Sequence, residues 1–511
     1  MEPTRQSYDY IVVGGGTAGC VLAARLSEDP TVHVLLIEAG PREPLEAMAV
    51  PAAWLSLLES VAVWGDSGAV NAFTGTRVAT PRGRGLGGSS CINGLVFVRG
   101  HHAGYDAWTR RGALGWGFDD LLPYFRRSET ATNGDPAVRG VDGPLIVGTP
   151  PTPNPMIAAA VEAAVEAGCR RAGDLSSGLE IGFGWPDFNI VNGARQSAAD
   201  AYLAPATERS NLEVVTDALV RRVVVVDGRA ARVEFSAGAT TATVDCTGEI
   251  VLAAGAIGSA QLLLLSGIGA SEHLRAVGVE PVLELPGVGA NLQDHPLASV
   301  TYQSSRPVPS IPANASGEAM GFIRTSVEMD SPDLQFVLHS LPVPVPTLPT
   351  PEHGYSILFS AINPHSRGNV RLAGPDADTL PHVDPNYLAD ARDVATMREG
   401  LRLARRIGEG AALGSWRGTE VHPGPHVDDA DDALDEYLRL SLRCYFHYVG
   451  TCRIGGDEMA VVDPQLRVRG ITSLRVADAS VMPSIVTANT AATVYGIAER
   501  AADLIRTQQQ N

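Results

Sequence analysis

The sequence predicts an α/β fold in which one domain, assembled from several segments of the chain, carries a second domain inserted between them. Strand and helix patterns alternate through residues 1–130, a meander of strands with short glycine turns follows Asn211, and a strand and a helix close the chain. With 511 residues, the chain is long enough for two domains with sizeable cores. Because no break in composition separates these domains, we expect them to interleave along the chain.

The first α/β unit is complete at 8–38. An apolar run at 8–13 suits a buried parallel strand, the segment 17–27 has the pattern of a helix, and a second apolar run follows at 32–37. The N-terminus of such a helix offers free N–H groups and a partial positive charge to an anion. The unit therefore predicts a place for a phosphate group at the start of the helix.

Three glycines and one acid give this unit the pattern of a dinucleotide cradle. Gly14 permits a tight turn, Gly16 lets the backbone approach a pyrophosphate, and Gly19 lets helix and strand pack closely. Glu38 follows the second strand at about the distance of an acid that binds a ribose, which argues against NADP. Because all parts of the unit are present, we interpret it as a Rossmann-like site rather than a chance turn. These residues do not separate NAD from FAD.

The other elements follow from apolar periodicity and from proline. The segment 304–351 is rich in proline, which removes backbone donors, so it is expected as loop or edge strand. Elsewhere we expect helices at 156–167, 255–265, 393–408, 430–442 and 487–506, and strands at 249–253, 355–362, 368–372 and 474–477.

Composition narrows the function. The formal net charge of −18 argues against nucleic acid as a partner. An acidic surface could favour cationic substrates, but acidity is also a common route to solubility. The sequence holds no lysine, which excludes a pyridoxal phosphate Schiff base or another lysine nucleophile. No apolar run has the length of a membrane span and no signal peptide is visible, so we expect a cytoplasmic protein without a membrane span.

Cysteine and histidine give no indication of a metal. The six cysteines contain no CxxC pair, and the twelve histidines contain no HExxH spacing. This pattern favours reduced, mostly buried thiols over disulfides or a zinc site. We therefore expect no metal in the functional site.

Further motifs lie between the first unit and the C-terminus. RGRGLGGSSCIN at 82–93 forms a glycine loop whose backbone can lie flat against a planar or phosphate-bearing ligand, and GAIGSAQLLLLSGIG and NLQDHP follow it. HYVGTCRIG at 447–455 matches the pattern HxxGTxxxG, and TANT stands at 487–490. In order and spacing, over essentially the whole chain, these motifs resemble the glucose–methanol–choline (GMC) family of FAD-dependent oxidoreductases.

The resemblance implies a mixed α/β and antiparallel-β architecture: a Rossmann-like FAD-binding domain with an inserted antiparallel-sheet substrate domain. Combined with the expected elements, it assigns 1–150, 196–300 and 440–511 to the FAD-binding domain. The segments 151–195 and 301–439 are left for the substrate-binding domain.

The resemblance also implies which residues hold FAD, and Trp64 is one of them in a less typical sequence context. Members with covalently bound FAD can carry histidine where this chain has Ile92, which cannot form that bond, so non-covalent FAD is expected. Residue by residue, the family's contacts fall at the pyrophosphate (Gly14, Gly16, Thr17, Ala18), the adenosine ribose (Glu38, Ala39), the adenine (Val220), the flavin and its ribityl chain (Ser90, Asn93, Gly94, Leu95, Val96), the second phosphate and ribityl contact (Asp478, Ala479) and the pyrimidine end of the flavin (Thr490, Ala491).

Two residues match the family's catalytic pair. His447 begins the HxxGTxxxG pattern, and a neutral imidazole can accept the hydroxyl proton of an alcohol near physiological pH. Asn489 occupies a position that holds His or Asn in relatives; it cannot take a proton but can hold the alcohol oxygen by a hydrogen bond. The other histidines are expected at the surface or in the core, although His295 and His339 could border the pocket.

The reaction implied is oxidation of a primary alcohol, the hydroxymethyl group of a small molecule, to the aldehyde, with oxygen or another electron acceptor as second substrate. The stretch at 354–372 is similar to bacterial members that act on small hydroxymethyl compounds. A choline-type enzyme needs an acid and an aromatic cage for its quaternary ammonium group, and the sequence shows none. A choline- or sugar-type alcohol dehydrogenase, a non-redox member such as a hydroxynitrile lyase, and a non-enzymatic flavoprotein remain the alternatives.

Overall fold

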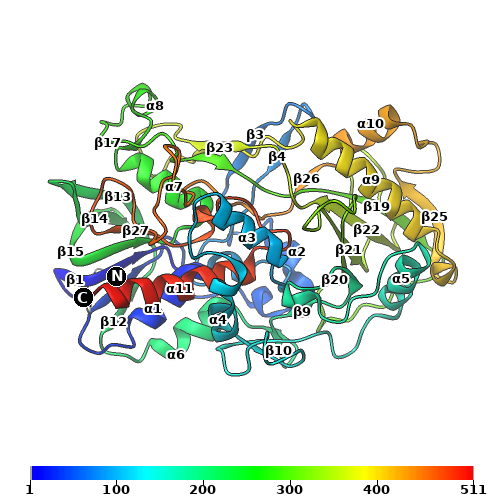
Figure 1. Ribbon diagram of the computed structural model, residues 1–511, viewed down its shortest axis with the longest axis horizontal. Coiled ribbons are helices and arrows are strands. Elements are labelled where there is room, and N and C mark those ends of the chain that lie inside the picture. The colour runs from blue at the N-terminus through cyan, green and yellow to red at the C-terminus, as the bar shows by residue number, and fades with distance from the viewer. Residues whose placement is uncertain (1–2, 510–511) are drawn as a thin grey trace.

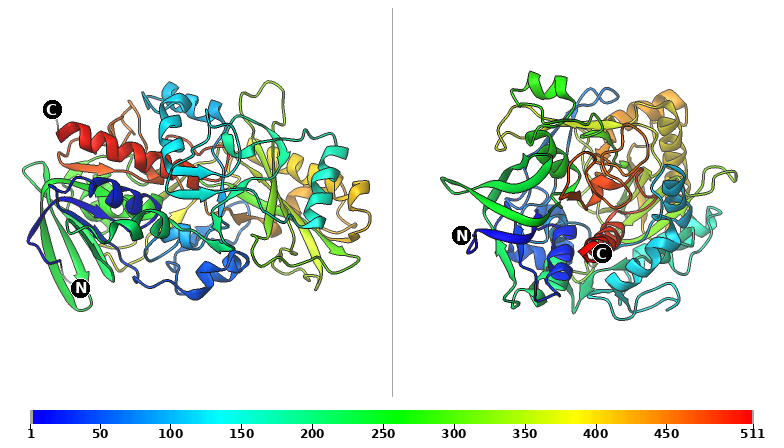
Figure 2. Two further views of the ribbon diagram at one scale, coloured as in Figure 1. Left: turned by 90° about the horizontal axis from the view of Figure 1, so that it is seen from below. Right: turned by 60° about the vertical axis from the view of Figure 1, so that its left-hand side comes forward.

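Two seven-stranded sheets lie at opposite ends of the molecule and divide it into two lobes (Figure 1). The computed structural model describes residues 3–509. The first strand and the last helix lie in the same lobe, which the two further views also show (Figure 2). The second lobe is therefore built from chain inserted between segments of the first.

The first sheet is formed by β1 (Ser7–Val13), β2 (Val34–Ile37), β12 (Leu212–Val215), β13 (Ala218–Val226), β14 (Arg229–Ala237), β15 (Thr240–Leu252) and β27 (Leu474–Val476). Its order is β12–β2–β1–β15–β14–β13, and β27 also pairs with β15. β12, β2, β1, β15 and β27 pair in parallel, whereas β13 and β14 add antiparallel pairs. A parallel strand is covered on both faces, which explains the continuous apolar runs of β1 and β2.

Helices pack against both the parallel and the antiparallel strands of this sheet. α1 (Thr17–Leu26) packs against β1, β2 and α11 (Ala491–Gln509), and α7 (Gly255–Leu265) packs against β13. Gly19 permits the close contact of α1 with the turn after β1, because a Cβ on Gly19 would stand 1.8 Å from the carbonyl oxygen of Gly14. The glycine spacing therefore fixes where the N-terminus of α1 points.

The second sheet is antiparallel and is formed by β8 (Gly182–Gly184), β19 (Pro296–Ser304), β20 (Gly317–Ile323), β21 (Leu334–His339), β22 (Gly354–Ala361), β25 (Arg417–His422) and β26 (Arg443–Cys444). Its order is β25–β19–β22–β21–β20–β8, and β26 also pairs with β19. α5 (Pro155–Glu166), α9 (Ala391–Gly408) and α10 (Asp431–Ser441) lie on its outer side, away from the first lobe (Figure 1). One face of the sheet is therefore left for the space between the lobes.

Shorter elements complete the fold. A five-stranded sheet has the order β18–β23–β24–β3–β4, and four strand pairs are β5–β9, β6–β7, β10–β11 and β16–β17. Their bounds, with those of the remaining helices, are α2 (Trp54–Leu57), α3 (His102–Arg110), α4 (Phe118–Ser128), α6 (Ala204–Ala206), α8 (Ser271–Ala276), β3 (Ser67–Val70), β4 (Arg77–Ala79), β5 (Val96–Phe97), β6 (Glu129–Ala131), β7 (Leu145–Val147), β9 (Asp187–Phe188), β10 (Ile190–Val191), β11 (Ala194–Arg195), β16 (Ile268–Gly269), β17 (Leu283–Glu284), β18 (Ala290–Leu292), β23 (Gly368–Arg371) and β24 (His382–Asp384).

The architecture expected from the sequence is confirmed, with one wrong element. The segment 304–351, expected as loop or edge strand, contains β20 and β21, which lie inside the second sheet. The prolines at 307–312 and 342–351 flank these strands, and Pro332 lies in the connection between them. They therefore interrupt no ladder hydrogen bond, and the proline count misled the prediction.

Two expected domain boundaries fall inside regular elements. The boundary at 300/301 would cut β19, and the boundary at 439/440 would cut α10. A strand or helix packs as one unit, so we propose to place these boundaries before Pro296 and after Ser441 instead.

The described residues give no sign of a membrane span or a metal centre. Within 3–509, no helix is both long enough and apolar enough to cross a bilayer. In the same range, no cluster of three or more His, Cys, Asp or Glu side chains has the arrangement of a metal site. The six cysteines are free thiols, and five of them are buried.

Candidate active site

A cavity of about 560 Å³ lies between the two sheets. On one side it is lined at the carboxyl ends of β1, β2 and β15, by Val13, Ile37 and Ala253. On the other side it is lined by the inner face of the second sheet. The cavity therefore joins the place where a parallel α/β sheet binds ligands to the face that the antiparallel sheet leaves free.

Three helices begin at this cavity. The first residues of α1, α7 and α11 line its wall. Gly14 has a φ of +101°, and a Cβ there would stand 2.8 Å from the carbonyl oxygen of Ala253. A Cβ on Gly88, in the second glycine loop, would stand 2.7 Å from Gly16 Cα. Backbone amides and the positive ends of three helices can therefore approach one ligand, which suits the negative charge of a pyrophosphate.

Glu38 is buried where the glycine loops meet. Its Oε2 accepts a hydrogen bond from Gly15 N at 2.7 Å, and its Oε1 accepts from Gly40 N at 2.8 Å and Gly85 N at 3.1 Å. Burial raises the pKa of the Glu38 carboxyl, and the three backbone donors oppose that shift. Besides lining the cavity, Glu38 ties together the loops that form it, a role that the sequence alone did not show.

Asp478 has the same function at another part of the first-lobe wall. Its Oδ2 accepts hydrogen bonds from Gly255 N at 2.8 Å and Ser259 Oγ at 2.5 Å, and its Oδ1 accepts from Ser480 N at 2.8 Å. Burial raises the pKa of this carboxyl as well, against the effect of these donors. Asp478 thereby fixes the N-terminus of α7 to the turn that follows β27.

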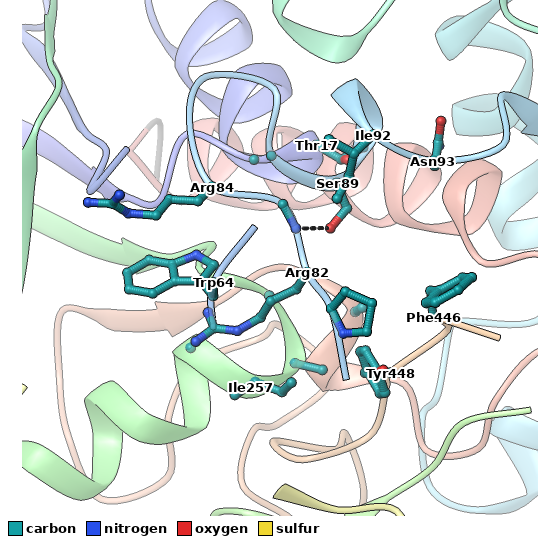
Figure 3. A pocket seen from close by; sticks show the side chains of 18 of the residues that line it. Thr17, Trp64, Arg82, Arg84, Ser89, Ile92, Asn93, Ile257, Phe446 and Tyr448 are labelled. Carbon is teal, nitrogen blue, oxygen red and sulfur yellow. Dashed lines mark hydrogen bonds between the residues drawn. The ribbon is translucent and has the colours of Figure 1, made fainter. Parts of the chain in front are cut away.

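Trp64 lies between two guanidinium groups on the first-lobe side of the cavity (Figure 3). The Cζ atoms of Arg82 and Arg84 lie 4.5 and 5.4 Å from the centre of its ring, distances suited to cation–π contact. Arg82 is also paired with the buried carboxylate of Asp66, and Ser89 Oγ accepts a hydrogen bond from Gly83 N at 3.1 Å. The loop at 82–93 is therefore held rigidly against Trp64.

Ser90 and Asn93, two polar residues expected along the flavin, have hydrogen-bond partners in the protein, whereas the side chain of Leu95 lies outside the cavity wall. Ser90 Oγ donates to Gly87 O at 2.6 Å, and Asn93 Oδ1 accepts from Arg195 Nη1 at 2.6 Å. Leu95 has a φ of 63° and is fully buried beside Phe188 and Ala315, outside the cavity wall. The other expected residues all line the cavity: Gly14, Gly16, Thr17, Ala18, Glu38, Ala39, Trp64, Ser90, Asn93, Gly94, Val96, Val220, His447, Asp478, Ala479, Asn489, Thr490 and Ala491.

His447 and Asn489 meet at the boundary between the two halves of the cavity. His447 Nε2 lies 3.3 Å from Asn489 Nδ2, and both side chains are buried. The backbone N–H of His447 donates to Asp294 Oδ1 at 2.6 Å, and Tyr445 packs on the imidazole with ring centres 4.3 Å apart. The expected catalytic pair is therefore assembled and held from several directions.

A chain of hydrogen bonds decides the tautomer of His447. Gln335 Nε2 donates to Asn489 Oδ1 at 2.8 Å, which turns the Asn489 amide nitrogen toward His447 Nε2. That nitrogen is a donor, so His447 Nε2 is the acceptor and carries a lone pair. The ring proton of His447 is then on Nδ1, which lies 2.9 Å from Nδ1 of His295 and donates to it. The base nitrogen of His447 therefore lies beside Asn489, and both residues line the cavity.

Burial keeps both imidazoles neutral. It lowers the pKa of His447 well below its usual value, and His295 adds to that effect. Burial likewise lowers the pKa of the fully buried His295 to about 3. Neutral imidazole is the form that can accept a proton, so the pair is ready to act as a base near neutral pH.

Asp294 and Gln335 belong to the site but were not assigned to it from the sequence, and His295, expected only as a neighbour of the pocket, bonds to His447 directly. Asp294 and His295 belong to the NLQDHP motif, which carried family resemblance but no assigned role. Asp294 also accepts from Tyr387 Oη, and burial raises the pKa of its carboxyl to about 6. Gln335 lies in β21, within the segment that was expected to be loop, so no local signal pointed to it.

Comparison with known proteins agrees with this geometry. Two family models, both described as GMC oxidoreductase, match residues 8–297 and 364–498. The chain is 38% identical to mitochondrial choline dehydrogenase of Homo sapiens over 541 residues, covering 99% of this chain and 91% of that protein. It is 37% identical to oxygen-dependent choline dehydrogenase of Vibrio vulnificus (strain YJ016), with coverage of 99% and 95%.

Solved structures share the whole fold. Pyridoxine 4-oxidase from Mesorbium loti superposes with a TM-score of 0.94 at 35% identity and covers 99% of each chain. A formate oxidase superposes with a TM-score of 0.92 at 25% identity over the full length of both chains. FAD is the cofactor typical of this family. The chain therefore belongs to the GMC oxidoreductase family and is an enzyme that oxidises alcohol (CH–OH) groups.

Proposed function

We propose that this enzyme oxidises a primary alcohol, the hydroxymethyl group of a small molecule, to the aldehyde, with His447 as the base. The observation that carries this proposal is the position of His447 Nε2, a neutral acceptor beside Asn489 on the cavity wall. An alcohol placed there has its hydroxyl within reach of a base and its oxygen within reach of an amide donor.

The first-lobe half of the cavity suits FAD. Backbone amides, three helix N-termini and the buried Glu38 fit the pyrophosphate and ribose of a dinucleotide. When bound, FAD supplies the acceptor for the hydride that leaves the alcohol carbon. Ile92 lines the same half and has no atom that could bond to the flavin, so we propose that FAD is held without a covalent bond.

The residues of the site account for the remaining proton and for the geometry. His447 Nε2 accepts the hydroxyl proton while the hydride leaves the carbon, so the alcohol loses two electrons and becomes the aldehyde. When the alcohol is bound, its hydroxyl would replace the Asn489 N–H at the lone pair of His447 Nε2, and Asn489 Nδ2 could then donate to the alcohol oxygen and orient the carbon that gives the hydride. Gln335 keeps the Asn489 amide in this orientation.

An anaerobic experiment tests the proposal. The purified flavoprotein is mixed without oxygen with a panel of primary alcohols, and loss of the oxidised flavin absorbance is followed by stopped flow. We expect several primary alcohols to bleach the flavin with formation of an equivalent of aldehyde. If no alcohol does so while dithionite does, the proposal is wrong. Admission of air or of a quinone then identifies the electron acceptor.

The cofactor linkage is tested separately. Precipitation of the protein with acid should release the flavin into the supernatant, where its absorbance can be measured. Flavin that stays in the washed pellet would contradict the non-covalent proposal.

Choline-type activity is the second candidate for the reaction, because curated relatives at 37–38% identity carry that name.

A further inference from the structure

In the second-lobe half of the cavity, residues of one strand follow one another along the wall, and their order bears on the substrate of the proposed reaction. Gln335, Val337 and His339 are alternate residues of β21 and share one face of the strand. Gln335 bonds to Asn489, and Val337 and His339 line the cavity, so this face is turned to the site. At about 3.3 Å per residue, the Cα atoms of Gln335 and His339 are about 13 Å apart. β21 therefore runs from the catalytic pair to the far end of the cavity.

The middle of this wall is apolar. Val337 is paired with Met320 of β20 and Leu358 of β22, and all three side chains line the cavity. Leu297 of β19 and the aromatic ring of Phe446 line it as well. A ligand that reaches from the catalytic pair toward His339 must therefore lay an apolar body against this row.

The far end of this wall is neutral, and its polar atoms bond to one another. His339 Nε2 lies 2.8 Å from Ser316 Oγ, which also accepts from Trp54 Nε1 at 3.2 Å, and His339 Nδ1 lies 3.1 Å from Leu341 O, so both ring nitrogens have partners in the protein. Burial, with a smaller contribution from the cation Arg443, lowers the pKa of the His339 imidazole to about 4, against the opposing effect of its hydrogen bond to Leu341. His339 is therefore uncharged near neutral pH, and a positive group contributes to the field around it.

The acidic residues of the cavity belong to the first-lobe half. Of the described residues that line it, the acids are Glu38, Asp378 and Asp478. Glu38 and Asp478 accept backbone hydrogen bonds in the first lobe, and Asp378 pairs with Arg221 of β13 at 3.0 Å. Glu318 of β20 is buried and accepts from Asn154 N at 2.9 Å, outside the cavity wall.

A quaternary ammonium group in the second-lobe half would thus lose water without meeting a carboxylate. Burial of an unpaired charge is costly, whereas burial of an apolar group of the same shape is favourable. Aromatic faces such as that of Tyr445 give a cation some attraction, but Arg443 opposes it. The electrostatics of this half therefore favour a neutral ligand.

We propose that the substrates are neutral primary alcohols with an apolar body, and that cationic alcohols such as choline are rejected. This inference rests on the proposed function and names its substrate class. It separates the chain from the substrate named by its curated relatives.

A matched pair of alcohols tests the charge preference. Choline and 3,3-dimethylbutan-1-ol have the same shape, with a quaternary nitrogen in one and a quaternary carbon in the other. In anaerobic flavin reduction we expect the neutral alcohol to have the larger ratio of reduction rate constant to half-saturation concentration, by at least about 10-fold. An equal or larger ratio for choline overturns the inference but leaves alcohol oxidation standing. If every alcohol of the panel fails, the proposed function fails with it.

Discussion

The two halves of the cavity are built from different parts of the chain. In the first lobe, the wall is mostly backbone: glycine turns, the N-termini of three helices, and two carboxylates that accept backbone hydrogen bonds. In the second lobe, the wall consists of side chains standing on a sheet. A wall of backbone depends on turn geometry, so it suits a ligand that never changes. A wall of side chains can change its chemistry without changing the fold.

The largest expected effect lies at His447, where the two halves meet. His447→Ala should fold and bind FAD, because the cofactor wall does not depend on this side chain. It should slow flavin reduction by a saturating alcohol roughly 10²–10⁴-fold, the range of a lost general base. Stopped-flow reduction measures this, and dithionite reduction at the wild-type rate is the control. Reduction by alcohol at the wild-type rate would show that the mechanism is wrong.

Glu38 tests the backbone-built half. Glu38→Gln replaces one acceptor oxygen by an amide donor that faces backbone N–H groups, which should weaken FAD binding about 10–100-fold and lower the melting temperature. Titration of the apoprotein with FAD gives the affinity. The fraction that stays loaded should be reduced at the normal rate. Asp378→Asn is the control, because Asp378 lines the same half but is mostly exposed and should have little effect.

Asn489 should matter less than His447, since it orients the alcohol but takes no proton. We expect Asn489→Ala to slow flavin reduction about 10-fold, the cost of one hydrogen bond that orients the substrate. Asn489→His should retain part of the activity, because an imidazole can also donate to the alcohol oxygen. A loss in Asn489→Ala as large as that in His447→Ala would assign the proton transfer to the wrong residue.

The smallest effect is expected from pH. An imidazole with the ordinary pKa near 6.5 would lose about four-fold of its neutral form between pH 8 and pH 6. Because burial lowers the pKa of His447, its base form persists at lower pH, and the rate of flavin reduction should change by less than about two-fold over this range. A fall centred at pH 6.5 that disappears in His447→Gln would show that the ring is more hydrated than the structure indicates.

The two halves of the cavity also differ in how much of each could be predicted from the sequence. Gly14, Gly16 and Glu38 are close in the chain, so their spacing alone describes the turn and the strand that they serve. The family motif gives the position of Leu95 but not its positive φ or the burial of its side chain beside Phe188 and Ala315, which the sequence could not show.

Most of the second-lobe wall could not be predicted from the sequence, for a different reason. Val337, Met320 and Leu358 become neighbours only through strand register, which no local pattern in the sequence specifies. Gln335 and His339 are ordinary residues of a short segment between proline-rich stretches. Their roles depend on which face of β21 is turned to the cavity, and that face is set by the sheet as a whole.

The alternation of β21 also bears on how such an enzyme can change over generations. Phe336 and Leu338 point away from the cavity into the core, where Phe336 packs on Phe183 with ring centres 5.6 Å apart. Val337 and His339 line the cavity instead, and Val337 also packs against Met320 and Leu358. Substitutions at 337 and 339 can therefore change which substrates fit while the residues at 336 and 338 preserve the core, whereas Gln335 is constrained because it orients Asn489. Enzymes descended from one stable ancestor can in this way diverge in substrate without first losing stability.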